Sequence, residues 1–192
     1  MKPRELLDFL RTVETLKTNT RHSITSGGVL ETVAAHSWRL AVMALLVAPE
    51  IEDIDREKVI RMCLIHDFGE AVTGDIPSFE KSEANEQAEG DAVLKLLSQL
   101  PDPQQEELSG LFEEMNAQET KESRLYKALD KLEAVIQHNE SDIKTWIPLE
   151  YQLNVEYGTE NAAEFPFLRS LREIVREDTK RKIEQAEGEN DS

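Results

Sequence analysis

The chain has 192 residues and a formal net charge of −17, and both numbers limit what the protein can be. This length suits one well-packed domain and is short for two. The acidic charge argues against nucleic-acid binding through a basic face. The same charge repels a phosphorylated substrate, so a site for such a substrate needs local positive charge from a metal ion, an arginine or both.

Signals of export or membrane insertion are not evident in the sequence. No window holds the ~20 apolar residues of a membrane span. The N-terminus alternates charged with apolar residues and lacks the apolar core of a signal peptide. The single cysteine, Cys63, excludes an intramolecular disulfide and lies among apolar residues, which is typical of a buried structural thiol. We therefore expect a cytoplasmic protein that binds neither membrane nor nucleic acid.

Apolar residues recur near the 3.6-residue period along most of the chain, which predicts an all-α protein. Residues 17–30 break this period with Thr, Ser, Asn and Gly, so we expect a loop there, and its length hints at function. The predicted helices cover, in chain order, residues 3–16, 33–47, 56–70, 82–99, 103–116 and 121–140, then a short helix at 149–155 and a last one at 162–185.

We expect these helices to form one domain. Helix 33–47 is apolar on nearly all sides, which is typical of the centre of a bundle. Thr32 and Asp55 are predicted N-caps for the second and third helices. No internal repeat, low-complexity block or alternating strand pattern is evident. The prediction is a single all-α domain over residues 1–185, followed by a disordered acidic tail at 186–192.

Charged side chains gather at the end of the third predicted helix. The doublet His66-Asp67 ends its apolar run, Glu70 follows one helical turn later, and Asp75 follows a Gly-containing turn. Burying such groups unpaired costs several kcal/mol. A divalent metal ion is the simplest compensation for them, and it requires further ligands from elsewhere in the chain.

Two other residues are candidates for these ligands. His36 lies near the start of the apolar second helix and points towards the core side, although a lone histidine there is more often a hydrogen-bonded core residue. Asp130 lies at the edge of a buried helix face, although it could instead be a solvated aspartate paired with a nearby lysine. His22 and His138 lie in polar surroundings that are more typical of the surface.

These residues resemble the H…HD…D signature of HD-domain metal-dependent phosphohydrolases. His36, His66-Asp67 and Asp130 match the signature in order. The surrounding segments ETVAAHSWR and HDFGEAVTGDIP, together with Arg21 upstream, are similar to the branch that hydrolyses nucleoside 5′-monophosphates, which includes the 5′-deoxynucleotidases. The resemblance covers most of residues 3–140 and implies an HD-type helical bundle.

The resemblance also implies a metal site. His36, His66, Asp67 and Asp130 would bind one divalent metal ion. Two imidazoles and two carboxylates suit Mn²⁺, Co²⁺, Fe²⁺ or Zn²⁺ better than Ca²⁺. Family relatives are commonly homodimers, so a homodimer is the expected assembly.

Roles for four further residues follow from the same resemblance. Glu70 would orient the attacking water or accept its proton, and Asp75 would act on the sugar or leaving-group side, with general acid as one option. Arg21 would bind phosphate oxygens bidentately. His22 follows this arginine directly, where the bacterial 5′-deoxynucleotidase has tryptophan, and this change bears on the choice between deoxyribose and ribose. The alternatives are an exposed glutamate, a turn-forming aspartate and a surface-loop arginine.

Other activities fit the sequence less well. HD-type hydrolases of guanosine tetraphosphate carry a Glu-Asp pair within HDTVEDT, where this chain has HDFGEAVTGD. Cyclic-dinucleotide phosphodiesterases of the HD-GYP type need a GYP element and extra ligands, and deoxynucleoside-triphosphate hydrolases are usually much longer. A non-catalytic metal-binding helical protein would need the ligands but would not need Glu70, Asp75 or Arg21. A nucleoside 5′-monophosphatase is therefore the favoured function.

Overall fold

The computed structural model describes residues 1–190, with side chains described through residue 188. Most of this part is helical, as predicted. The elements are α1 (Pro3–Val13), a 3₁₀ turn (Glu14–Lys17), β1 (Thr20–Ile24), β2 (Leu30–Thr32), α2 (Val33–Val47), a 3₁₀ turn (Ala48–Glu50), α3 (Arg56–Ile65), α4 (Glu70–Thr73), α5 (Glu83–Leu97), α6 (Asp102–Ala117), α7 (Lys121–Glu140), a 3₁₀ turn (Ile143–Thr145), α8 (Pro148–Glu156), α9 (Thr159–Ala163) and α10 (Pro166–Asn190).

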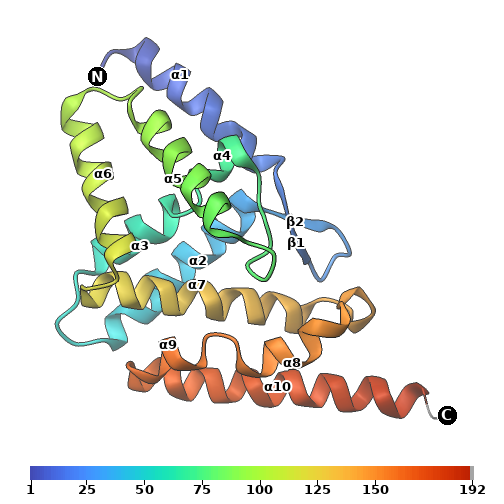
Figure 1. Cartoon of the computed structure of the whole chain (residues 1–192). Coiled ribbons are helices and arrows are strands. Elements are labelled where there is room, and N and C mark those ends of the chain that lie inside the picture. Colours follow the sequence, from blue (N-terminus) through green and yellow to red (C-terminus); the bar gives the residue numbers. More distant parts are fainter. Residues whose placement is uncertain (191–192) are drawn as a thin grey trace.

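Helix α7 crosses the middle of the molecule and contacts helices on both sides of it as well as β1 (Figure 1). On one side it packs against α2, α3 and α6, and on the other side against α9 and α10. The short helices α8 and α9 lie between α7 and α10 in this view. A single helix thus reaches both halves of the fold, and side chains along it are placed relative to one another by helix geometry alone.

Apolar side chains of the central helices form one continuous core. The prediction that α2 is central is confirmed, because Leu40 and Ala44 are fully buried. Cys63 is buried as predicted, and burial raises the pKa of its thiol. On α7 the buried apolar positions recur at helical spacing: Leu125, Ala128, Leu129, Leu132 and Val135. Burying this stripe against α2 and α3 is the main stabilising contribution that the sequence pattern predicts.

Helix starts follow their capping residues. The side chain of Thr32 accepts a hydrogen bond from the backbone N–H of Ala35, and that of Asp55 accepts one from Lys58. Both predicted N-caps are therefore confirmed. Thr120 caps α7 in the same way, which explains why its bounds coincide with the predicted ones.

The loop predicted over residues 17–30 is wrong in part, because this segment contains most of a β-hairpin. The two strands β1 and β2 pair antiparallel, with Ile24 opposite Leu30 and an irregular register between them. Gly28, with a φ of 79°, makes the turn. Strands of five and three residues with an irregular register leave too short an alternation to be recognised in the sequence.

The third predicted helix, 56–70, was too long. Helix α3 ends at Ile65, and the following N–H groups of Phe68, Glu70 and Ala71 bond three residues back instead of four. This tighter winding separates the doublet from Glu70, so the three side chains do not share one regular helix face. A Cβ on Gly69 would lie 2.7 Å from Cγ of Glu89, so glycine permits the close approach of α5 here.

The C-terminal region also differs from its prediction. The helix predicted at 162–185 is divided into α9 and α10 at Pro166, which lacks the N–H that would continue the first helix. Helix α10 then extends to Asn190, so the first part of the predicted disordered tail is helical in the structure. Residues 191–192 of that tail lie outside the described residues. Within residues 1–190, each helix is too short or too polar to cross a membrane.

Candidate metal centre and active site

Four side chains predicted as metal ligands converge between α2, α7 and the turn after α3. Nε2 of His36 lies 3.2 Å from Oδ1 of Asp130 and 3.9 Å from Oδ2 of Asp67. Nε2 of His66 lies 3.0 Å from Oδ2 of Asp67 and 3.6 Å from Oδ1 of Asp130. One nitrogen from each imidazole and one oxygen from each carboxylate therefore face a common point.

The other ring nitrogen of each histidine, Nδ1, already has a hydrogen-bond partner. Nδ1 of His66 lies 3.0 Å from the backbone oxygen of Cys63, and since a carbonyl only accepts, Nδ1 carries the proton. Nδ1 of His36 lies 2.5 Å from Oε2 of Glu133, which accepts in the same way. In the neutral rings, each Nε2 atom then carries a lone pair that faces carboxylate oxygens.

Lone pairs and carboxylates facing one another require a cation between them. Nε2 of His66 is buried and has no hydrogen-bond partner among the described residues. Burial and the charge of Arg21 lower the pKa of His36, but hydrogen bonds with Asp130 and Glu133 outweigh them and raise it to about 10. A proton and a divalent metal thus compete for the same atoms, and this donor set fits such a metal.

The carboxylate ligands are held in their ionised forms. Burial raises the pKa of Asp130, but the Lys127 ammonium, 2.9 Å from its Oδ2, and the bond from His36 outweigh burial and hold the pKa well below its usual range. Because Lys127 occupies Oδ2, Oδ1 remains directed at the two imidazoles. The pKa of Asp67 is lowered as well, since His66 outweighs burial.

Glu133 is a site residue that the sequence analysis missed. It is fully buried on α7, it accepts from His36, and it lies 3.7 Å from Arg21 and 3.6 Å from Arg39. Glu133 follows Asp130 by three residues, so the two share a helix face. That spacing was the available signal that Glu133 belongs to the site. A glutamate in a polar helix is usually exposed to solvent, so the signal is weak.

A cavity of about 330 Å³ opens beside the ligands. Its wall includes Asp67 and Asp130 together with all the residues predicted to catalyse or bind substrate, namely Arg21, His22, Glu70 and Asp75. This volume lies at the lower end of the range for small-molecule sites. The structure therefore brings the predicted site residues from β1, α4, the loop after α4 and α7 to one cavity.

Arg21 enters this cavity from β1 within a cluster of carboxylates. Its guanidinium lies 3.4 Å from Glu31, 3.7 Å from Glu133 and 4.0 Å from Asp75. Burial lowers the pKa of Arg21, but the charges of Asp67, Glu31 and Glu133 outweigh it and raise the pKa, so Arg21 stays protonated at any pH at which the protein folds. The hairpin that replaces the predicted loop thus fixes the arginine opposite the metal ligands.

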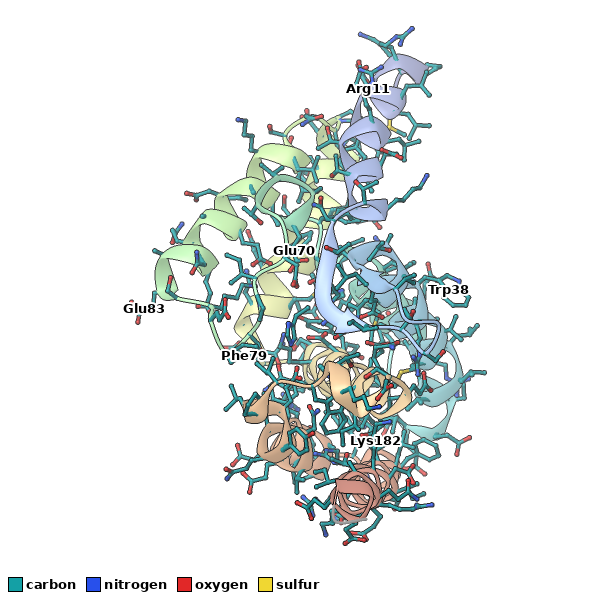
Figure 2. The ribbon with its side chains drawn as sticks, turned by 90° about the vertical axis from the view of Figure 1, so that its right-hand side faces the viewer. Arg11, Trp38, Glu70, Phe79, Glu83 and Lys182 are labelled. Atoms are coloured by element: carbon teal, nitrogen blue, oxygen red, sulfur yellow. The ribbon has the colours of Figure 1, made fainter. Side chains whose placement is uncertain are left out.

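Glu70 is buried at the start of α4, with 4% of its surface exposed (Figure 2). The amide of Asn19 donates to the Glu70 backbone oxygen at 2.6 Å and ties α4 to the hairpin. Burial, together with the charges of Asp67 and Asp75, raises the pKa of Glu70 to about 9. Its Oε2 is buried and unpaired among the described residues. Burial also raises the pKa of Asp75.

His138 is not the surface residue that the sequence predicted, and His22 is only partly exposed. Both line the cavity, and Nε2 of each faces Oε1 of Glu150, at 2.9 Å from His22 and 3.3 Å from His138. Glu150 comes from α8, in a region where the sequence offered no functional signal. His22 and Glu150 are more than a hundred positions apart in the sequence. The periodicity of a single sequence does not reveal such a contact.

One family model and several known proteins are similar to this chain. A family model described as the HD domain matches residues 13–167. The chain is 35% identical over 141 residues to the 5′-deoxynucleotidase HDDC2 of Bos taurus, over 71% of this chain and 68% of that protein. The protein of the same name from Homo sapiens is 32% identical over 141 residues, with the same coverage. A predicted metal-dependent phosphohydrolase from Magnetospirillum magnetotacticum superposes with a TM-score of 0.79 at 28% identity, over 93% of each chain.

Replacing Glu133 by glutamine should weaken metal binding about 10- to 100-fold, because the partner that orients His36 loses its charge. Competition with a chelator of known affinity, using Mn²⁺ or Co²⁺, measures this change. Glu140→Gln is the matched control, since Glu140 is also a glutamate of α7 that pairs with Arg39 of α2, but it does not touch His36. Equal metal affinity in the Glu133→Gln variant and the wild type would contradict the orienting role.

The raised pKa of Glu70 predicts a pH dependence for the metal-free protein. Its ordinary pKa of 4.5 applies to the unfolded chain, so the folded chain binds this proton more tightly, and the resulting stability is lost as pH rises towards 9. Glu70→Gln, which cannot ionise, should therefore be more stable than the wild type at pH 8.5, by on the order of 1–3 kcal/mol, and this advantage should shrink at pH 5.

Urea unfolding in the presence of a chelator measures this difference at both pH values. Glu113→Gln removes an exposed glutamate from the middle of α6 and should leave the stability unchanged. A Glu70→Gln variant that is less stable than the wild type at pH 8.5 would contradict the raised pKa of Glu70.

Proposed function

Since the chain belongs to the HD-domain family, we propose that it is a metal-dependent phosphohydrolase that releases phosphate from nucleoside 5′-monophosphates, deoxynucleotides included. The observation that carries this proposal is the convergence of two imidazoles and two carboxylates beside a cavity that also holds Arg21. The names of the relatives as 5′-deoxynucleotidases support the substrate class.

His36, His66, Asp67 and Asp130 would hold one divalent metal ion, with Mn²⁺, Co²⁺, Fe²⁺ and Zn²⁺ as the candidates that suit this mixed nitrogen and oxygen set. When bound, such an ion acts as a Lewis acid that lowers the pKa of water and neutralises phosphate oxygens. The excess of carboxylates around the cavity supports this assignment, because they would otherwise repel the phosphate.

The other cavity residues act on the water, the phosphate and the leaving group. A cation held beside Asp67 would favour the ionised form of Glu70, which its acidic surroundings otherwise disfavour. Ionised Glu70 accepts the proton of the attacking water, whose oxygen forms the new bond to phosphorus. Arg21 donates hydrogen bonds to the phosphate oxygens as negative charge develops on them. Asp75, whose pKa is raised, gives a proton to the 5′-oxygen as the P–O bond breaks. The products are a nucleoside and inorganic phosphate.

We also propose that the protein works in the cytoplasm. The free thiol of Cys63 supports a reducing compartment, since it is buried in the core and has no second cysteine to pair with. Nucleotide salvage or pool control is the metabolic setting that fits hydrolysis of nucleoside monophosphates.

A homodimer is the assembly that we propose. Exposed apolar side chains line a groove between α1, α2 and the end of α3, and the most exposed of them, Trp38, has 66% of its surface accessible and projects outward in Figure 2. Leu10 and Leu64 are the other exposed large apolar residues of the groove among the described residues. A contiguous apolar patch of this kind is a frequent protein–protein contact surface, and a second copy of the chain can cover it.

Phosphate release from a panel of ribo- and deoxynucleoside monophosphates tests the reaction. After removal of metal, the protein should be inactive, and adding back Mn²⁺ or Co²⁺ should restore release from 5′- but not 3′-monophosphates. Glu70→Gln should lower turnover about 10²- to 10⁴-fold. The variant should retain its metal, because Glu70 is not a ligand. Unchanged turnover in Glu70→Gln would remove this residue from the mechanism, and no release from any monophosphate would refute the proposed reaction.

Trp38→Glu should convert the proposed dimer into a monomer, because it places a charge in the apolar groove. Light scattering on the purified protein measures the mass in solution. Ile174→Glu is the control, since Ile174 is similarly exposed but lies on α10, away from the groove. A wild-type protein that is monomeric at micromolar concentration would contradict the proposed assembly.

A further inference from the structure

We propose that the part of the cavity formed by α8 and the C-terminal half of α7 is a nucleobase subsite, in which Asn154 and His138 hydrogen-bond to the base. This inference rests on the proposed function and deepens it. Its evidence is separate, because it comes from a hydrogen-bond network on α8 that contributes nothing to the metal site.

Helix α7 sets the distance between the two ends of the cavity. Asp130, Ala134 and His138 all line the cavity and follow one another at intervals of four residues, so they lie along one face of the helix. Eight residues of helix correspond to a rise of ~12 Å. A phosphate held beside Asp130 places its sugar near the middle of this face and its base near His138.

The imidazoles at this end of the cavity are held in fixed orientations by Glu150. Its Oε1 accepts from Nε2 of His22 at 2.9 Å and faces Nε2 of His138 at 3.3 Å, while Oε2 accepts from the backbone N–H of Ile147 at 2.8 Å. Ser23 Oγ also lies 3.5 Å from Nε2 of His138. Burial lowers the pKa of His138, which keeps its ring neutral, and a proton on Nε2 leaves Nδ1 as an acceptor.

Asn154 supplies the complementary donor. It lies one helical turn after Glu150, lines the cavity and is 97% buried, with 3% of its surface exposed. Its side-chain amide nitrogen is buried and has no hydrogen-bond partner among the described residues. Its backbone oxygen accepts from the buried guanidinium of Arg172 at 2.9 Å, so α8 is fixed at this residue. A buried amide donor without a partner is costly, and a ligand acceptor would satisfy it.

These groups together fit a flat, uncharged heterocycle. The unpaired amide of Asn154 donates, Nδ1 of His138 accepts, and the Phe79 ring, whose centroid is 5.7 Å from that of His22, adds an apolar wall. In Figure 2, Phe79 lies on the loop between Glu70 and Glu83. Neighbouring donors and acceptors are what the polar edge of a nucleobase presents. The carboxylate of Glu150 disfavours a second phosphate here.

The test compares substrates with and without a base. Asn154→Leu keeps the side-chain size but removes the amide, and it should lower kcat/KM for deoxynucleoside 5′-monophosphates about 5- to 150-fold. Hydrolysis of 2-deoxyribose 5-phosphate, which lacks a base, should stay within about twofold of the wild type. Gln152→Leu removes an exposed amide from the same helix and should change neither rate.

Equal losses for both substrates in a folded Asn154→Leu variant, or no loss for either, would overturn the subsite. If Asn154→Leu does not fold, the smaller Asn154→Ser replaces it in the same comparison. If the wild type hydrolyses no monophosphate, the proposed function fails, and calorimetry with phosphate-free deoxynucleosides then tests the subsite by itself. Binding that Asn154→Leu weakens supports the subsite, and the absence of nucleoside binding to the wild type overturns it.

Discussion

A buried histidine joins the two central helices, and the geometry of the whole site depends on it. His36 on α2 contacts α7 twice, through Nδ1 to Glu133 and through Nε2 to Asp130. Each contact compensates a carboxylate that would be costly to bury alone. Because Glu133 holds Nδ1, the direction in which Nε2 faces Asp130 follows from the packing of two helices. This proposed metal ligand is therefore preorganised by the core, with no flexible loop involved in placing it.

The electrostatics of the site explain how an acidic protein accommodates an anionic substrate. Asp130 is paired with Lys127, and Arg21 is surrounded by three carboxylates, so little net positive charge is left for a phosphate. A divalent cation reverses this balance locally. Metal and phosphate binding are thus thermodynamically coupled, and each should strengthen the other by the same factor. The acidic surroundings then serve selectivity, because an anion is excluded until the cation is in place.

The parts of the site that follow regular helix periodicity could be predicted from the sequence, and the parts built from long-range contacts could not. Helix α7 has its predicted bounds, since its apolar stripe is strong and Thr120 caps it. The four side chains that converge could be proposed as ligands because histidine and aspartate are rare in apolar helices. The hairpin was missed because its strands are short and its register irregular. Glu133 and Glu150 were missed because a glutamate in a helix is usually solvated, and only the packed structure reveals that both are buried.

The arrangement of functions along α7 constrains how this chain can change. One uninterrupted helix carries Asp130, a proposed metal ligand, Glu133, which contacts His36, and His138, which lines the far end of the same cavity. Inserting or deleting a single residue between Asp130 and His138 would rotate everything downstream by about 100° and shift it by ~1.5 Å. Such a change would turn His138 away from Glu150 while leaving Asp130 in place. Homologous sequences should therefore vary in length in the loops around α7 and keep the number of residues within it constant.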